Sequence, residues 1–286
     1  MKKRIWELDA LRGLCLLCMI VIHFVFDLGA FAGLQFTTPG WFDFLQTYGH
    51  IFFILISGIC ATLASRSFRR GVIVFAAGLL VSAVTVFMEF VLKFRGLSIY
   101  FGILHLLGLC MMLYPLFKRL PVWALTVLGA AFVAAGVWLA SLAHVDVKFP
   151  SFWGLLLSAV GIRPTGFYSA DYFPLFPNFG WFLLGAFLGK TAYRRRESLL
   201  PKVNADFFLL RFFRFCGRHS LLIYLVHQPV LAGLVMLFTL LKELTKPCKS
   251  RTLLSVESFS TFGRAASPIR GVTFGRPSRM LYGIKV

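Results

Sequence analysis

Long apolar runs recur along this chain, and they constrain its fold more than any other feature. A helix needs roughly 18 or more apolar residues to cross the hydrocarbon core of a bilayer. Only 14% of the residues are charged, whereas a soluble domain carries about 25%. The sequence therefore predicts an all-α fold, a polytopic helix bundle in a membrane. We expect about seven spans, near residues 11–34, 44–64, 71–92, 99–117, 122–143, 175–192 and 219–241.

The placement of lysine and arginine predicts a cytoplasmic N-terminus, since these residues accumulate in the inner segments of membrane proteins. With that orientation the outer loops between spans hold only Lys93, Arg95, Lys148 and Arg163, and the other basic residues before the last span lie inside. The net charge of +19 is then explained by topology and anionic lipid headgroups. We therefore expect a multi-pass protein of the cell membrane and no nucleic-acid partner.

The composition changes sharply after the last apolar run. We place the transmembrane domain at residues 1–244 and a basic tail at 245–286, which is rich in Ser, Thr, Gly and Arg. Such a composition buries too little apolar surface to order itself, so we expect the tail to be disordered. Seven spans would place this basic tail outside, against the charge bias. Three explanations are open. The tail is tolerated outside, the span count is off by one, or the segment does not belong to the native reading frame.

The first apolar run carries ionisable residues, which are costly in lipid and mark functional sites. They are Asp9, Arg12, His23 and Asp27. Arg12 and His23 are eleven residues apart, about three full helical turns, and Asp27 follows His23 by one turn. All four therefore share one stripe of a helix, which must face protein or water. For Asp9 and Arg12 a structural ion pair at the inner mouth is an equally good interpretation.

Further polar residues interrupt the later spans. His50 and His105 each lie in a predicted span, where a histidine is more often a hydrogen-bonded packing residue than a catalyst. In the last span Tyr224, His227 and Gln228 share one face, and Pro229 frees backbone carbonyls, which is tolerated beside a cavity. The candidates for binding the substrates are His50, His105, Tyr224, His227 and Gln228. The cysteines form no metal-spaced set, so we expect no metal.

Two loops leave alternatives open. In the inner loop at 193–218, phenylalanines alternate with Arg211, Arg214 and Arg218, which is typical of an amphipathic helix at the membrane surface. Alternatively, some of these arginines hold the phosphates of a donor such as an acyl-coenzyme A. The outer loop at 144–174 is the longest between spans, and it is either a lid over a substrate site or a packed cap.

Several motifs together resemble a known family of membrane proteins. They are Arg4 with Glu7–Gly13 and His23–Leu28, His50–Gly58, Phe101–His105, Asp171–Trp181, and Gly217–Pro229. Over about residues 4–235 the chain resembles bacterial membrane proteins that share the catalytic domain of heparan-alpha-glucosaminide N-acetyltransferase. The spacing of Arg12 and His23 also resembles membrane acyltransferases that O-acylate sugars. One departure is that residues 35–43 contain no histidine, whereas the lysosomal enzyme has its catalytic histidine in the loop after its first span.

The resemblance implies an enzyme that moves an acetyl group from cytosolic acetyl-coenzyme A to an acceptor, often a carbohydrate, reached from the other face. Our hypothesis is that His23 acts as general base, because a histidine suits this work near neutral pH. Asp27 would orient its ring, Arg12 would bind donor phosphate or brace the entrance with Asp9, and the last span would stabilise the oxyanion. His23 as an acetyl-accepting nucleophile is the alternative chemistry.

The competing class of function is a proton-coupled transporter of a small solute, because inward-facing His and Asp on membrane helices also form proton relays. Transporters often consist of two related halves, and we find no such internal similarity. The sequence names neither the acceptor nor the acyl group, and it leaves open whether the chain forms a homodimer.

Overall fold

The computed structural model describes residues 5–34, 37–91, 96–141, 145–203 and 206–244, together with 280–281 and 284–285. The expected disordered tail therefore lies outside the described residues, apart from the two short strands β3 (Met280–Leu281) and β4 (Ile284–Lys285). A second pair, β1 (Val145–Lys148) and β2 (Pro164–Thr165), is parallel. The rest of the regular structure is helical, which confirms the all-α prediction. The helices are α1 (Trp6–Ala32), α2 (Gly40–Leu63), α3 (Ser67–Phe90), α4 (Ile103–Phe117), α5 (Val122–Ser141), α6 (Phe152–Val160), α7 (Leu175–Thr191), α8 (Phe208–Arg218) and α9 (Ser220–Leu244).

Five of these helices are long and apolar enough to cross a membrane, namely α1, α2, α3, α5 and α9. The predicted spans at 99–117 and 175–192 correspond to α4 and α7, which have 15 and 17 residues. At 1.5 Å per residue these two helices are about 22 and 25 Å long, shorter than the roughly 30 Å hydrocarbon core. The chain is thus a multi-pass membrane protein, and the count of seven stays a prediction.

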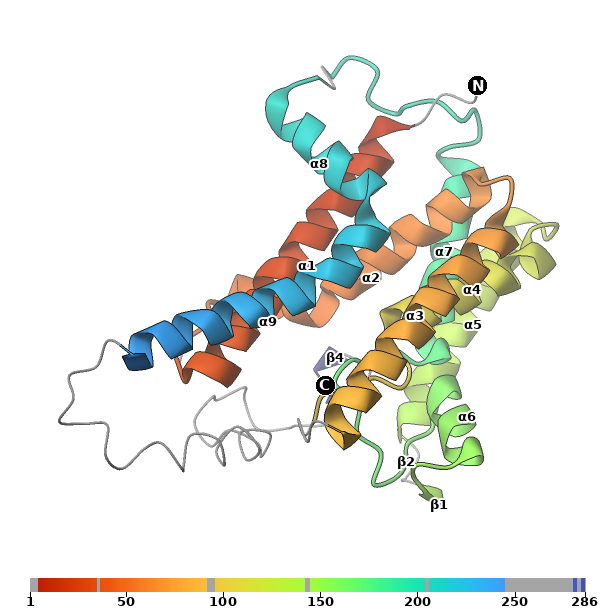
Figure 1. Ribbon diagram of the computed structural model, residues 1–286. Coiled ribbons are helices and arrows are strands. Elements are labelled where there is room, and N and C mark those ends of the chain that lie inside the picture. Colours follow the sequence, from red (N-terminus) through yellow and green to blue (C-terminus); the bar gives the residue numbers. More distant parts are fainter. Residues whose placement is uncertain are drawn as a thin grey trace.

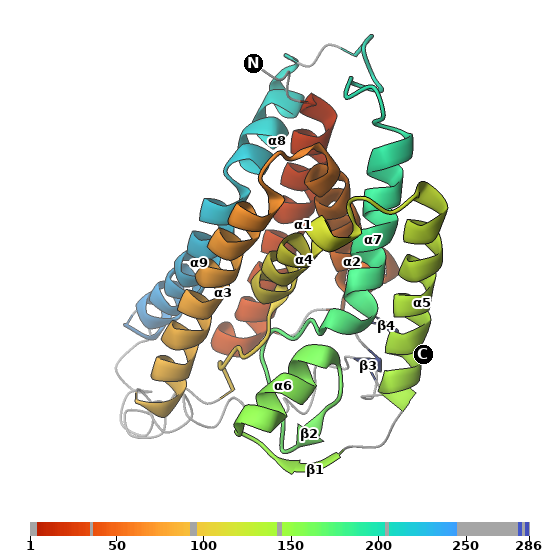
Figure 2. The same cartoon turned by 90° about the vertical axis from the view of Figure 1, so that its right-hand side faces the viewer.

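The helix bundle has two distinct ends (Figure 1). The N-terminal end of α1 and the helix α8 lie at one end, and α6, β1 and β2 lie at the other. Figure 2 shows the same separation from the side. The shorter helices α4 and α7 lie within the bundle, and their side chains form much of the core, including Leu106, Phe179, Phe182 and Leu183. In contrast, α3 and α9 are apolar but mostly exposed, which suits helices that face lipid.

Glycines allow the closest helix crossings. A Cβ atom at Gly58 of α2 would overlap the carbonyl oxygen of Phe182 in α7, and one at Gly185 would overlap that of Leu55. Helices in membranes associate through such small residues because no hydrophobic force drives them together in lipid. The crossing of α1 and α8 is equally tight, since a Cβ at Gly217 would overlap the carbonyl oxygen of Asp9.

The first helix begins earlier than the apolar run that predicted it. The run starts at residue 11, but α1 starts at Trp6, with Glu7 and Asp9 in its first turn. Acidic side chains stabilise this end of a helix because they offset its dipole. Glu7 is buried, and its carboxylate accepts hydrogen bonds from the Ser198 hydroxyl at 2.8 Å and the Leu199 amide at 2.7 Å. The polar start of α1 thereby holds the segment that follows α7.

Candidate functional site

The first and last long helices, α1 and α9, pack side by side (Figure 1) and bring polar residues together. The ring of His23 in α1 lies 5.2 Å from that of His227 in α9, measured between centroids and tilted by 60°. One turn further along α1, the carboxylate of Asp27 accepts hydrogen bonds from the Gln228 amide at 3.0 and 3.3 Å. We call these four side chains the α1–α9 polar cluster.

The hydrogen bonds of His227 indicate its tautomer. Its Nδ1 lies 2.6 Å from the carbonyl oxygen of Tyr224, which only accepts, so Nδ1 carries a proton. In the neutral ring the other nitrogen, Nε2, is then an acceptor. Nε2 is buried and has no hydrogen-bond partner among the described residues, and the same holds for the side-chain oxygen of Gln228. Buried polar atoms without partners are costly, so both atoms are suited to bind a polar group of a ligand.

Asp27 is 1% exposed, and a carboxyl group buried to this degree needs hydrogen bonds. Gln228 supplies them to both oxygens, whereas no hydrogen bond joins Asp27 to His23 in the described part of the chain. His23 and Asp27 are one turn apart and share a helix face. Which of the two is hydrogen-bonded depends on the neighbouring helix α9, where Gln228 reaches Asp27. The predicted role of Asp27 in orienting His23 therefore stays a prediction.

Asp171 joins the outer loop to the helices α4 and α9, and we assigned it no role from the sequence. Its Oδ2 accepts hydrogen bonds from the Ile103 amide at the start of α4, at 3.1 Å, and from the Tyr224 hydroxyl at 3.4 Å. Burial raises the pKa of Asp171 to about 6, against the smaller lowering by these two hydrogen bonds. The loop is therefore tied to both α4 and α9 by one carboxyl group. The signal available in the sequence was an aspartate among aromatic residues, in a motif that the chain shares with the family it resembles.

His105 has both ring nitrogens engaged in bonds that hold its own surroundings. Nδ1 accepts from the Gly102 amide at 3.2 Å and so caps α4. Nε2 lies 3.3 Å from the Ser82 hydroxyl, which donates its own proton to the Ile99 carbonyl at 2.5 Å. Nε2 must then donate to Ser82, which fixes a neutral ring. This geometry favours the packing role that we considered for His105.

The ring of His50 contacts Phe173, with the centroids 5.1 Å apart. Phe173 belongs to the outer loop, and its amide donates to the Phe101 carbonyl at 3.0 Å. No hydrogen bond of the His50 ring is found within the described residues. The structure thus places His50 against the loop, separate from the contacts that define the α1–α9 polar cluster.

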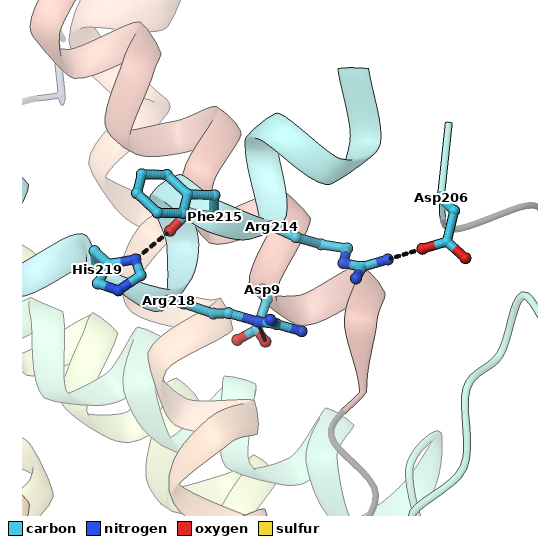
Figure 3. Close-up of polar contacts among 6 residues, drawn as sticks. All are labelled: Asp9, Asp206, Arg214, Phe215, Arg218 and His219. Atoms are coloured by element: carbon cyan, nitrogen blue, oxygen red, sulfur yellow. Dashed lines mark hydrogen bonds and ion pairs between the residues drawn. The ribbon is translucent and has the colours of Figure 1, made fainter. Parts of the chain in front are cut away.

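Asp9 and Arg12 lie about four and about three turns from His23, toward the N-terminal end of α1. Asp9 forms an ion pair with Arg218, with 3.5 Å between Oδ2 and Nε (Figure 3). Arg12 lies beside Cys60 of α2. The predicted stripe is thus continuous on α1, but its two ends contact different helices. The Asp9 end of the stripe faces α8 through the Asp9–Arg218 ion pair, and the expected pairing of Asp9 with Arg12 stays a prediction.

No group of three or more His, Cys, Asp or Glu residues that could hold a metal ion is found in the part of the chain that the structure describes. The chemistry available in the α1–α9 polar cluster is that of imidazole, carboxyl and amide groups. Two neighbouring imidazoles with an acceptor nitrogen between the helices are suited to removing a proton from a hydroxyl or amine.

Comparison with known proteins gives one result. The chain matches the family described as "Heparan-alpha-glucosaminide N-acetyltransferase, catalytic" over residues 4–229. The matched range includes the whole α1–α9 polar cluster, Asp171, and the α1–α8 crossing. No curated protein and no solved structure matches the chain.

Proposed function

Because the chain belongs to the heparan-alpha-glucosaminide N-acetyltransferase catalytic family, we propose that it transfers an acetyl group from acetyl-coenzyme A to a carbohydrate-like acceptor, with His23 as general base. The observation that carries this proposal is the pairing of His23 and His227 across the α1–α9 polar cluster. The family itself suggests a membrane acetyltransferase. The acetyl-coenzyme A donor, the carbohydrate-like acceptor and His23 as the base are parts of our proposal.

The reaction needs a group that accepts a proton as the acceptor attacks. A hydroxyl or amine of the acceptor attacks the thioester carbonyl, and His23 takes the proton from the attacking atom. The carbon–sulfur bond then breaks, and the imidazolium returns the proton to the leaving thiolate. The products are the acetylated acceptor and coenzyme A. General-base catalysis of this kind typically contributes about 10²–10⁴-fold to the rate.

His227 supports the same step from the other helix. Because its Nδ1 donates to the Tyr224 carbonyl, its Nε2 is held ready to accept a hydrogen bond from the acceptor. We assign it the positioning of the acceptor beside His23. Gln228 would hold the acceptor or the oxyanion through its amide, and Asp27 would fix the orientation of that amide. Arg12 and Asp9 remain candidates at the entrance used by the donor.

The test is acetyl transfer by the purified protein in detergent, with acetyl-coenzyme A labelled in its acetyl group and glucosamine as the trial acceptor. We expect His23→Ala to lower the rate by about 100-fold or more. His227→Ala should mainly raise the KM for the acceptor. The matched control is His144→Ala, which removes a histidine that we assign to no site and should leave the rate unchanged. Full activity of His23→Ala would contradict the assignment of the base.

A second measurement separates direct transfer from a covalent path. The protein is incubated with labelled acetyl-coenzyme A without an acceptor, denatured, and analysed by mass spectrometry. Direct transfer predicts no acetyl group on His23, whereas the nucleophile alternative predicts one. If the protein does not bind acetyl-coenzyme A and instead supports proton-dependent solute uptake in vesicles, the transporter interpretation replaces our proposal.

A further inference from the structure

The outer loop holds Asp171 between α4 and α9 on a backbone that is itself fixed. The Ala170 amide donates to the Ser98 carbonyl at 3.0 Å, and the Phe173 amide donates to the Phe101 carbonyl at 3.0 Å. These two bonds pair the loop with the segment that leads into α4. We call residues 169–173 the outer cap. Because its backbone is packed against the bundle, its carboxyl group is a fixed point for the helices that it contacts.

One oxygen of Asp171 contacts two helices. Its Oδ2 accepts hydrogen bonds from the Ile103 amide in the first turn of α4, at 3.1 Å, and from the Tyr224 hydroxyl of α9, at 3.4 Å. A Cβ atom at Gly102 would overlap this oxygen, so the carboxyl group fits closely against the start of α4. The space beside Asp171 and Tyr224 has a volume of about 10 Å³, which suits one water and is too small for a sugar. On this side the Tyr224 hydroxyl therefore meets the outer cap and not an acceptor.

Tyr224 connects the outer cap to the α1–α9 polar cluster through its backbone. Its carbonyl oxygen accepts a hydrogen bond from Nδ1 of His227 at 2.6 Å, and the two rings lie 5.3 Å apart between centroids. Pro229 has no amide proton, so the carbonyl of Leu225, four residues earlier, lacks its helical donor. The helix is less constrained by its own backbone in this turn. Contacts from outside α9 therefore influence where His227 lies.

We propose that Asp171 is a positioning residue for His227 and acts through Tyr224. The bond from the Tyr224 hydroxyl to the outer cap fixes this turn of α9. The Tyr224 carbonyl then holds Nδ1 of His227, and Nε2 is directed toward the acceptor beside His23. Asp171 itself touches no substrate. The inference rests on the proposed function, in which His227 positions the acceptor, and it adds that the outer cap controls how tightly the acceptor binds.

The kinetic test separates KM from kcat in acetyl transfer to glucosamine by the full chain purified in detergent. Tyr224→Phe removes only the hydroxyl, so we expect the KM for glucosamine to rise roughly fivefold and kcat to stay within about twofold, because the bond to a charged acceptor is lost. Asp171→Ala should raise this KM by a similar factor. The double variant should be no worse than the poorer single variant, since both substitutions remove one interaction.

The matched control is Tyr172→Phe, which also removes a hydroxyl from the outer cap. That hydroxyl donates to the Ser158 carbonyl at 2.8 Å, away from α9, so both kinetic constants should stay unchanged. Multiplied KM effects in the double variant would overturn the proposal, because Asp171 and Tyr224 would then act independently. A KM that Asp171→Ala still raises when His227→Ala is already present would overturn it as well.

A second measurement does not need acetyl transfer. In protein labelled with nitrogen-15 in its histidine rings, the NMR signals of His227 are identified by their loss in His227→Ala. We expect these signals to shift in Tyr224→Phe and in Asp171→Ala, and to stay in place in Tyr172→Phe. Unshifted signals in the first two variants would overturn the positioning role.

The two measurements keep the two proposals apart. If the native chain transfers no acetyl group, the proposed function fails, and the His227 signals still decide whether Asp171 positions that ring. The thermal unfolding midpoint checks the folding of each variant. If Asp171→Ala does not fold, Tyr224→Phe decides by the same NMR shift and the same KM, because it leaves the bond between Asp171 and the Ile103 amide in place.

Discussion

The pairing of Asp27 with Gln228 is the most consequential contact at the residue scale. Gln228→Leu would leave a buried carboxyl group without its donor, so we expect it to destabilise the protein by about 1–3 kcal/mol. Asp27→Leu should cost less, and adding it to Gln228→Leu should recover part of the loss. A double-mutant cycle of thermal unfolding in detergent measures this coupling. Strictly additive effects of the two substitutions would mean that the hydrogen bonds do not contribute to stability.

Asp171 gives the protein a predictable dependence on pH. Burial raises its pKa to about 6 from the usual 3.8 of an aspartate, so the folded state binds a proton more tightly than the unfolded state does. The stability from this group is complete below about pH 4 and is lost as the pH rises through about 6. The side chain in Asp171→Asn stays neutral, as the protonated acid is. The unfolding midpoint of this variant should therefore fall less than that of the native chain between about pH 4 and 6.

The measurement is the midpoint of thermal unfolding in detergent between pH 4 and 7, and the readout is the difference between the two proteins. The control is Asp146→Asn, which changes an exposed aspartate of the same outer loop. It should follow the native curve. A native curve parallel to that of Asp171→Asn would show that the carboxyl group does not titrate in this range.

At the scale of elements, the sequence predicted which residues share a helix face, but not which other helix that face contacts. The spacing of His23 and Asp27, and of Tyr224, His227 and Gln228, fixed two polar faces, because helical period is a local property. That the two faces meet depends on how α1 and α9 pack, which no local pattern encodes. His105 shows the same limit, since Gly102 and Ser82 occupy its nitrogens. The role of Asp171 likewise depends on where a long loop returns to α4.

The crossing of α1 and α8 is an element-scale feature that a single methyl group should disturb. Gly217→Ala places a Cβ against the carbonyl oxygen of Asp9, which is backbone and cannot move aside cheaply. We expect a loss of about 1–3 kcal/mol from this overpacking, measured by thermal unfolding. Gly233→Ala in α9 is the control, because nothing lies within 4 Å of its added Cβ. Equal stability of the two variants would contradict so close a crossing.

For the whole molecule, the open question is the number of passes and their direction. The number of apolar runs predicted seven spans, and five helices meet the length for a span while α4 and α7 are shorter. The arrangement supports seven passes, because α6, β1 and β2 lie at the end opposite to α8 and the start of α1 (Figures 1 and 2). Whether the short, buried helices α4 and α7 also cross the membrane decides the count, which stays a prediction.

Reporter fusions test this topology. A fluorescent protein that matures only in the cytoplasm, fused after Arg196, should fluoresce, since an N-terminus inside places the segment before α8 inside as well. Fused after Lys148 it should stay dark, and an enzyme that is active only outside should give the reverse pattern. Fluorescence after Lys148 would mean that the short helix α4 does not cross, and the same signal after Lys148 and Arg196 would mean that α7 does not cross. A fusion after Leu244 tests α9, because a crossing by α9 places its end on the other side of the membrane from Arg196, so fluorescence at both positions would contradict seven passes.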